Sequence, residues 1–543
     1  MAHEVPDPSS PSTDQVRFCA SVIDDSKVAE GLEDQLRAST GRPRSLGVRA
    51  LLVALFALAL DDRPLHLLAA TRLLFCQLPA TTRRLLGVEG DATTTRALLA
   101  CYRRVRYLFH RVLSVVDPSK EPKNRRMAVA LFDALRKDID AEEQHRRRAQ
   151  LDSFVSDLVF ASIKVCSAQE LAGFSGGVGL DGTPVPLWSR GPSQRAGLSA
   201  SDPDGGWYVR EGDHRETTGP TGKALRKLFW AVEATIVTMG RGPGTTPEHP
   251  NLICGITLGR PGADPGGSAL RLLANLNQRG WRAGSLGVDR GYSQGLPERF
   301  HLPVAALGYS VVMDYKEADL GRQANSGGAT LVDGTFYCPA MPEVLVTAGA
   351  DRRAGLIDEA TFAGRIAARR PYRLVRKQGP DNDGFCRYGC PAQGLHPHLS
   401  CSLRPEATHL AVGKIPVLSP PSEPPRICTQ SAVTIAPDVG ARFRQDLAWG
   451  TEEWAATYAS FRNTIEGTNG YLKDPAHQAL AAPGRRRVRG IAAQSVFVAL
   501  LVMASNVRKI AAFRQLVADG AQQRVAQRAR RRRTSLRDFQ PSG

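Results

Sequence analysis

The residues of this chain best suited to phosphate and metal chemistry lie between Thr451 and Asp474. The segment TEEWAATYASFRNTIEGTNGYLKD is typical of a helix. At about 100° per residue, one face of that helix gathers a phenol, a carboxylate and two cations within about 80°: Tyr458, Arg462, Glu466 and Lys473. Carboxylates bind hard metal ions, and cations suit phosphate oxygens. A solvated face with an Arg462–Glu466 pair explains the same pattern, so the face needs partners elsewhere in the chain.

Two isolated acids are candidates for those partners. Asp181 stands in GVGLDGTPVPLW, where an Asp-Gly turn would explain it equally well, although the apolar residues on both sides favour a continuing strand. In SLGVDRGY, Leu286 and Val288 alternate inward, which puts Asp289 at the end of a strand on the opposite face. We therefore expect Asp181 and Asp289 to project from a sheet toward Glu466.

Four cysteines suggest a second site. Cys386, Cys390, Cys401 and Cys428 are separated by three, ten and twenty-six residues, with three histidines nearby, namely His396, His398 and His409. This spacing is looser than the tight pairs of zinc ribbons, which favours free buried thiols and leaves zinc as the alternative. With or without zinc, we expect the four cysteines to cluster in space.

Composition restricts the partner and the compartment. The 543 residues have a net charge of +18, which points to a polyanion: DNA, RNA or an anionic membrane surface. The longest apolar runs, near residues 50–60 and 491–504, fall short of the roughly 20 residues that a bilayer crossing needs, so we expect buried core helices and no membrane partner. The N-terminus has no signal-peptide pattern, and ten cysteines make no disulfide framework. A cytoplasmic protein is expected.

The chain divides by its local patterns. Residues 1–14 are rich in Pro and Ser and are expected to be disordered. Residues 15–175 read as an all-α domain whose basic residues make it the DNA-binding candidate, a helical bundle with solvated arginines being the alternative. Those basic residues are residues 41–44 (GRPR), Arg83, Arg84, Arg103, Arg104, Arg106 and the run Arg146–Arg148.

From residue 176 the pattern changes to short apolar runs. Residues 176–314 are expected to form five strands with helices after the third and fourth, and residues 191–222 a polar loop. Residues 315–445 are expected to form an inserted β-containing subdomain, with strands in ATLVDGTFYC and EVLVTA. Residues 446–516 return to the core, and residues 517–543 form a disordered basic tail. This order of strands and helices is that of an RNase H-like α/β fold, which needs acids on two strands and on a late helix.

Asp181 in LDGT, Asp289 in VDRGY and Glu466 in RNTIEG together resemble the DDE transposases of bacterial insertion sequences. The closest subgroup has a Tyr-Arg-Glu-Lys signature. Three residues separate Arg462 from Glu466 and six separate Glu466 from Lys473, as in that signature, whereas the family pattern would put the tyrosine at Ala459 instead of Tyr458. The resemblance covers about residues 176–516, and the subgroup also has a β-rich insertion before the acid-bearing helix.

The resemblance implies a function and a set of partners. Asp181, Asp289 and Glu466 would bind two Mg²⁺ or Mn²⁺ ions for phosphodiester cleavage and strand transfer. Tyr458, Arg462 and Lys473 would hold DNA phosphates. The partners would be the inverted repeats at the ends of the element and target DNA, bound by a homodimer at the bacterial nucleoid. Two alternatives remain: a transposase-derived DNA-binding protein without catalysis, and an RNase H-like metal-dependent nuclease.

Overall fold

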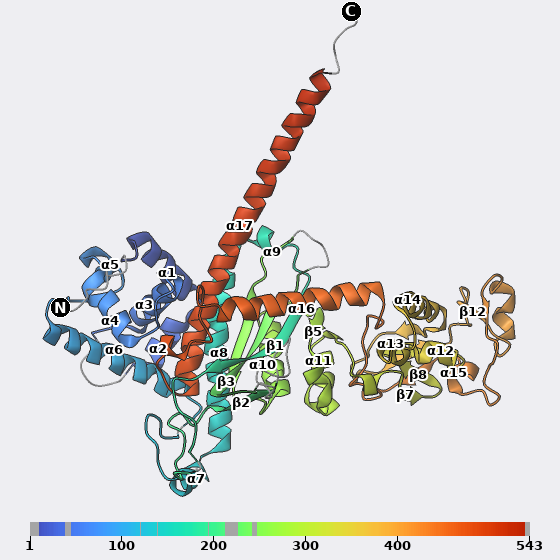
Figure 1. Ribbon diagram of the computed structural model, residues 1–543, viewed down its shortest axis with the longest axis horizontal. Helices are drawn as coiled ribbons and strands as arrows, with labels where there is room; N and C mark the ends of the chain where they lie inside the picture. The colour runs from blue at the N-terminus through green and yellow to red at the C-terminus, as the bar shows by residue number, and fades with distance from the viewer. Residues whose placement is uncertain are drawn as a thin grey trace, which may run out of the picture.

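The computed structural model describes residues 10–37, 45–119, 121–137, 139–193, 195–211, 226–241 and 247–537. Figure 1 shows helices at the N-terminal end, a sheet in the middle and a smaller mixed subdomain at the far end. Helix α16 (Glu452–Lys473) runs across the sheet toward that subdomain, and α17 (Ile491–Arg537) projects from the centre (Figure 1). Most of the segment expected to be disordered, and the GRPR run, lie outside the described residues. Helix α1 already begins at Thr13, because Ser12 and Gln15 form a capping box.

The N-terminal part is helical throughout its described residues. Its helices are α1 (Thr13–Asp25), α2 (Val28–Leu36), α3 (Val48–Leu60), α4 (Leu67–Arg72), a π-helical turn η1 (Leu73–Gln77), α5 (Ala80–Leu85), α6 (Thr95–Val116), α7 (Val129–Lys137), α8 (Ala141–Ile163) and α9 (Ala168–Leu171). Helix α3 is apolar on all sides and is almost entirely buried, between α1, α2 and α17. A helix with this composition has no polar face for solvent, so it forms the centre of the helical core.

One basic run expected to contact DNA is used inside the molecule. Arg146 and Arg147 both pair with Glu143, one turn before them on α8. Arg148 pairs with the buried Asp152 and donates hydrogen bonds to Thr257 and to the carbonyl of Leu258. These bonds tie α8 to the sheet. Glu143 and Asp152 therefore offset part of the positive charge of this run within the fold.

The central sheet has six strands: β1 (Val178–Pro186), β2 (Gly206–Glu211), β3 (Arg226–Met239), β4 (Ile253–Gly259), β5 (Ser285–Gly287) and β6 (Ser310–Val312). β3 is antiparallel to β1, β2 and β4, whereas β5 is parallel to β1 and β6 is parallel to β5. Without β2, the spatial order is β4, β3, β1, β5, β6. Helices α10 (Pro265–Gln278) and α11 (His301–Ala306) and the 3-10 turns η2 (Arg290–Gln294) and η3 (Pro297–Arg299) link the later strands.

Strand β2 corrects the expected loop over residues 191–222. Trp207 and Tyr208 lie in this strand, opposite Trp230 and Phe229 of β3, with ring centroids 5.3 Å apart in each pair. Cross-strand aromatic pairs stabilise antiparallel strands, and they outweigh the turn-forming residues around them. The expected fifth strand is also shorter than predicted, because its first residues form α11.

The chain leaves the sheet after β6 and returns to it with α16. Between them are three small sheets, η4 (Glu317–Asp319), η5 (Arg370–Tyr372), η6 (Pro405–Leu410) and four helices, α12 (Glu343–Val346), α13 (Ala348–Arg353), α14 (Glu359–Ala368) and α15 (Arg426–Thr429). The strands are β7 (Arg322–Ser326), β8 (Ala329–Val332), β9 (Thr335–Tyr337), β10 (Val375–Gln378), β11 (Cys386–Gly389), β12 (Leu399–Ser400), β13 (Ile415–Pro416) and β14 (Val433–Ile435). The segment EVLVTA, expected as a strand, is mostly helical, since Pro342 precedes it and Glu343 occupies the first turn.

Helix α17 follows α16 through the turn η7 (Pro483–Arg485). By length and composition, Ile491–Gly520 could cross a membrane, but 67% of its most apolar 18-residue stretch is buried inside the protein. It packs on α8, α3 and β4. The helix extends to Arg537, through much of the tail that we expected to be disordered. Alanine, glutamine and arginine are good helix formers, which favours this continuation despite the like charges.

Candidate active site

Asp181 and Asp289 lie beside each other because of the strand register. β1 and β5 are parallel, and Gly179 is paired with Gly287. Each acid follows its glycine by two residues, so it points to the same face of the sheet as that glycine. The motif Gly-x-Asp therefore occurs at aligned positions of two neighbouring strands. This places the two carboxylates as the sequence predicted.

Helix α16 packs directly onto these glycines. A Cβ on Gly179 would lie 2.5 Å from Cδ1 of Ile465, and a Cβ on Gly287 would lie 2.5 Å from Cβ of Phe461. Gly177 and Gly240 face Phe461 as well. The glycines are needed for space, since any side chain would lift the helix away from the sheet. Close packing at this point brings the polar face of α16 next to both acids.

A small pocket under α16 contains both acids. Its lining includes Asp181, Asp289, Tyr458 and Arg462, with apolar walls from Leu180, Val288, Phe461 and Ile465. Tyr458 is held by stacking on Trp454, with ring centroids 5.2 Å apart and 8° between the planes. Two of the predicted phosphate-binding residues thus face the acids. Lys473, in the last turn of α16, is close enough to lower the pKa of Asp181.

Burial and the nearby carboxylate of Asp289 raise the pKa of Asp181 to about 6. The amide of Gly182 and the cations Arg462 and Lys473 act in the opposite direction. Asp181 accepts hydrogen bonds from the Gly182 amide at 2.8 Å and from Nδ2 of Asn469 at 2.9 Å. Asp289 accepts one from the Gly291 amide at 2.9 Å. Two close carboxylates without a shared cation repel each other, and that repulsion raises the pKa.

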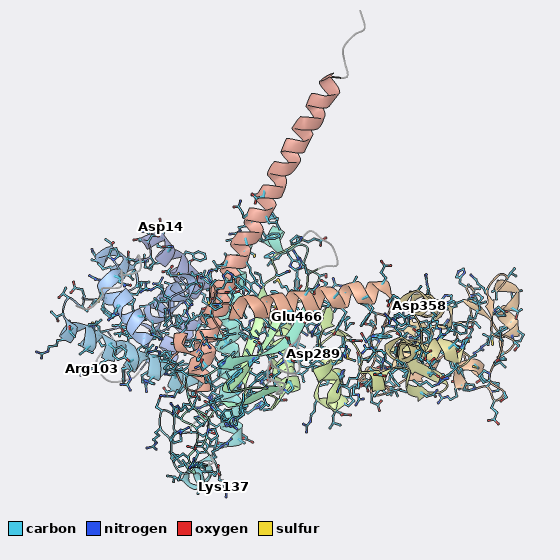
Figure 2. The ribbon with its side chains drawn as sticks, in the orientation of Figure 1. Asp14, Arg103, Lys137, Asp289, Asp358 and Glu466 are labelled. Atoms are coloured by element: carbon cyan, nitrogen blue, oxygen red, sulfur yellow. The ribbon has the colours of Figure 1, made fainter. Side chains whose placement is uncertain are left out.

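Glu466 does not lie among the residues that line this pocket. Its side chain is 58% exposed and pairs with Arg462 at 2.5 Å. Helix geometry explains this position: measured from Ile465, which packs on the sheet, Glu466 lies about 100° around the helix, whereas Asn469 lies about 40° around. Asn469 therefore takes the place beside Asp181. Figure 2 shows Glu466 on α16 and Asp289 below it at the sheet.

The donor set at Asp181 and Asp289 fits a magnesium or manganese ion. Both ligands are carboxylates, Asn469 adds an amide, and within the described residues no ion pair involves either acid. No group of three or more His, Cys, Asp or Glu in the described part of the chain already has the spacing of a metal site. The fit is thus to two of the three predicted acids. Glu466 would join them only if its pair with Arg462 opened.

A third strand-end acid was missed by the sequence reasoning. Asp314 is buried and follows β6 as Asp289 follows β5, and β6 is the strand next to β5. It pairs with Arg290 at 2.5 Å and Arg353 at 2.8 Å and accepts a hydrogen bond from Trp449. Two guanidinium groups neutralise it, so it positions Arg290 beside Asp289 instead of acting as a free ligand. The sequence could have indicated this acid, because Asp314 directly follows the strand-like segment SVVM.

The four predicted cysteines are only partly brought together. Cys390, Cys401 and Cys428 line one cavity, and the fourth thiol there is Cys338. Cys386 is at the other end of β11 and lies near Arg444. Four residues of extended chain span about 13 Å, so Cys386 and Cys390 cannot both face a cavity of atomic size. The predicted set was therefore wrong at Cys386.

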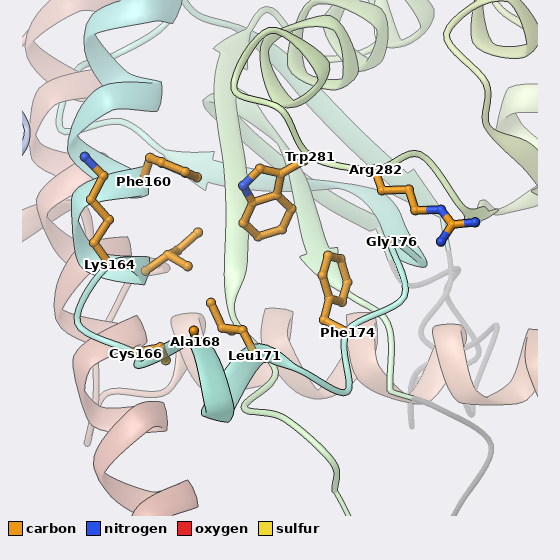
Figure 3. Close-up of a pocket in the computed structure, with 10 residues that line it drawn as sticks. Phe160, Lys164, Cys166, Ala168, Leu171, Phe174, Gly176, Trp281 and Arg282 are labelled. Carbon is orange, nitrogen blue, oxygen red and sulfur yellow. The ribbon is translucent and has the colours of Figure 1, made fainter.

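A larger cavity lies away from the acids. Its volume is about 430 Å³, and it is lined mainly by apolar side chains around Phe160, Phe174 and Trp281 (Figure 3). Lys164 and Arg282 stand at its edge, and its lining contains no carboxylate. Cys166 also lines it, but burial raises the pKa of this thiol to about 11, and the lining has neither a histidine nor a carboxylate to activate it, so we place the candidate active site at Asp181 and Asp289.

The chain was compared with protein-family models, with curated proteins and with solved structures. None of the three comparisons found a match.

Proposed function

We propose that this chain is a DNA transposase that cleaves and joins phosphodiester bonds at the ends of an insertion sequence. One observation carries the proposal: Asp181 in β1 and Asp289, two residues after the end of the neighbouring parallel strand β5, line one pocket directly under a helix that bears Arg462, Glu466 and Lys473. An RNase H-like core is part of this proposal. It is supported by the order of elements: the antiparallel strands β1, β3 and β4, with β2 added between the first two, are followed by the parallel strands β5 and β6 and by a late helix across the sheet.

The two carboxylates have a defined task in this reaction. Asp181 and Asp289 would hold the divalent ions, which supply a nucleophilic water or 3′-hydroxyl and neutralise the leaving oxygen. Asn469 orients the Asp181 carboxylate through its hydrogen bond. The buried pocket walls keep the acids partly out of water, which strengthens every charge interaction there.

The cations of α16 would position the DNA backbone. Arg462 faces the acids from the helix, and its planar guanidinium suits two phosphate oxygens. Arg462 now pairs with Glu466, so a phosphate that binds Arg462 competes with that pair. Release of Glu466 from this pair would leave a third carboxylate free to bind the metal ions when DNA binds. Substrate binding and assembly of the acid triad would thus be linked.

The position of Glu466 also supports a second candidate function. A chain in which Glu466 stays paired with Arg462 has two acids in its pocket and would bind DNA without cutting it. The net charge of +18 serves DNA binding in either case.

A strand-joining assay separates the two functions. We expect the purified protein, with Mg²⁺ and DNA carrying the ends of its own element, to cut and join strands, and Asp181→Asn, Asp289→Asn and Glu466→Gln each to abolish this while DNA binding persists. Glu453→Gln, an exposed acid in the first turn of the same helix, is the matched control and should remain active. Full activity of any of the three variants would refute the triad, and DNA binding without joining by the wild type would favour the non-catalytic function.

A further inference from the structure

A cavity in the inserted subdomain is enclosed by four thiols. Cys338, Cys390, Cys401 and Cys428 all line it, and its volume is about 10 Å³, room for a single atom or water molecule. Three of the four side chains are buried, and Cys401 is partly exposed. The cavity lies where two small hydrophobic clusters of the subdomain meet, one containing Cys338 and Cys390 and the other containing Cys428.

Three of the thiols are placed by strand ends. Cys338 directly follows β9, Cys390 follows β11 and Cys401 follows β12, while Cys428 lies in α15. The first two share the sequence Cys-Pro-Ala. In both, the amide of the alanine two residues after the cysteine acts to lower the pKa of the thiol, whereas burial, the larger effect, raises it. An amide donor of this kind favours a negatively charged sulfur.

A buried cation completes the surroundings. Arg404 lines the same cavity and is 8% exposed, and its positive charge acts to lower the pKa of the Cys390 thiol against the larger effect of burial. Its terminal nitrogens also donate to the carbonyls of Ile427 and Gln430, on either side of Cys428, whereas its Nε has no hydrogen-bond partner. Its ion-pair partner, Glu406, is 3.6 Å away and more than half exposed. Glu406 therefore offsets the charge of this buried guanidinium only in part, and neutral thiols add no negative charge.

We propose that Cys338, Cys390, Cys401 and Cys428 bind one structural Zn²⁺ ion. Four thiolates and Zn²⁺ form a centre with two net negative charges, which Arg404 and the two alanine amides would offset. Binding releases the four thiol protons to solvent, with no change of oxidation state. Within the described residues the sulfurs do not yet have the spacing of a bound ion, so they must converge to about 2.3 Å from it.

The ion would hold together elements that are individually weak. β9 has three residues and β12 has two, and α15 is a single turn. Small units of this kind gain much of their stability from a metal that links distant segments. This inference does not depend on the proposed transposase function, because the site lies in the inserted subdomain and concerns its folding.

Metal analysis of the full-length protein tests the inference. Protein purified without chelator and dialysed against ZnCl₂ is expected to hold about one zinc per chain. Cys338→Ser and Cys390→Ser should each lose most of it. Cys386→Ser is the matched control: Cys386 is buried in the same subdomain, outside the cavity, so this variant should keep its zinc. Replacement by Co²⁺ should give the visible absorption of tetrahedral sulfur ligation in wild type and in Cys386→Ser.

A second measurement uses only the wild-type protein, so it does not depend on whether the cysteine variants fold. In wild-type protein, bound zinc should protect four thiols from alkylation, and a strong chelator should expose Cys338, Cys390, Cys401 and Cys428 together, as read by mass spectrometry. Folded wild-type protein that binds no zinc after dialysis would overturn the inference. Loss of zinc in Cys386→Ser equal to that in Cys338→Ser, or protection that does not change with chelator, would overturn it as well.

Discussion

Among single residues, Asp181 has the most perturbed environment of the candidate site. Its pKa of about 6 lies above the ordinary value of an aspartate, so the folded protein holds a proton on it more tightly than the unfolded chain does. Between about pH 4 and pH 6 the folded state therefore binds more protons, and its stability falls as pH rises through this window. The ion that the site is proposed to bind would remove this cost.

We therefore expect Asp181→Asn to raise the stability of the metal-free protein at pH 8, by up to about 3 kcal/mol, and to change it little at pH 4. Denaturant unfolding in chelator at the two pH values measures this. Added Mg²⁺ should stabilise the wild type at pH 8 and leave Asp181→Asn unchanged. Equal effects of the substitution at both pH values would mean that ionisation of Asp181 does not destabilise the folded protein.

Arg462 tests the phosphate role of the same helix face. We expect Arg462→Ala to weaken binding to all DNA sequences alike and to reduce the slope of log affinity against log salt by about one. Its ion pair with Glu466 is exposed, so folding stability should fall by only a few tenths of a kcal/mol. Arg462→Lys should not restore cleavage, because an ammonium group lacks the planar fork. An unchanged salt slope would leave Arg462 as a solvated surface partner of Glu466.

At the scale of elements, the approach of α16 to the sheet decides the site. Phe461 and Ile465 occupy space that glycines leave open on β1, β5 and the end of β3. The acids stand two residues after two of these glycines, so their distance from the helix depends on this packing. A shift of α16 would separate Arg462 and Asn469 from Asp181.

Gly179→Ala tests this dependence. The added methyl group would collide with Ile465, and we expect a loss of about 1–3 kcal/mol in stability and a reduction of cleavage on the order of a hundredfold. Gly467→Ala on α16 is the control: a Cβ there meets no atom within 4 Å, and the substitution should stabilise the helix by about 0.5–1 kcal/mol. The double variant Gly179→Ala with Ile465→Ala removes both colliding atoms of Ile465 and should recover part of the loss. A Gly179→Ala protein with full stability and cleavage would contradict the role of this contact.

At the scale of the whole molecule, some of the basic residues are paired within the fold and others are exposed and free to contact DNA. Arg146 and Arg147 are occupied by Glu143, whereas α6 carries exposed basic residues on its outer side. Figure 2 shows Arg103 at the outer edge of the N-terminal helices. Arg103 and Arg106 are exposed and form no ion pair within the described residues, and Tyr107 beside them is 63% exposed. This face of α6 is the better candidate for DNA contact.

We expect the double variant Arg103→Ala, Arg106→Ala to lower DNA affinity and to reduce the salt slope by about two. The pair Arg146→Ala, Arg147→Ala removes the same charge and should change the slope less, because Glu143 already offsets one of the two charges. Titrations at several salt concentrations give both slopes. Equal losses in the two variants would show that the charge acts through the field of the whole protein.

The local patterns of the sequence determined much of this protein. They predicted the helical N-terminal part, the strand positions of Asp181 and Asp289 and the helix bearing Glu466, because burial and hydrogen bonding impose periodicities of 2 and 3.6 residues on the chain. They did not predict β2, whose aromatic pairs form only with β3. They left two positions open for Glu466, contact with the other acids or a pair with Arg462, and the structure has the pair. Cys338 was also missed, although its Cys-Pro-Ala sequence repeats that of Cys390, since the spacing of cysteines along a chain does not reveal which strand ends meet. The β2–β3 pairs and the cavity of four thiols join residues far apart in sequence, and only tertiary packing decides which side chains share a space.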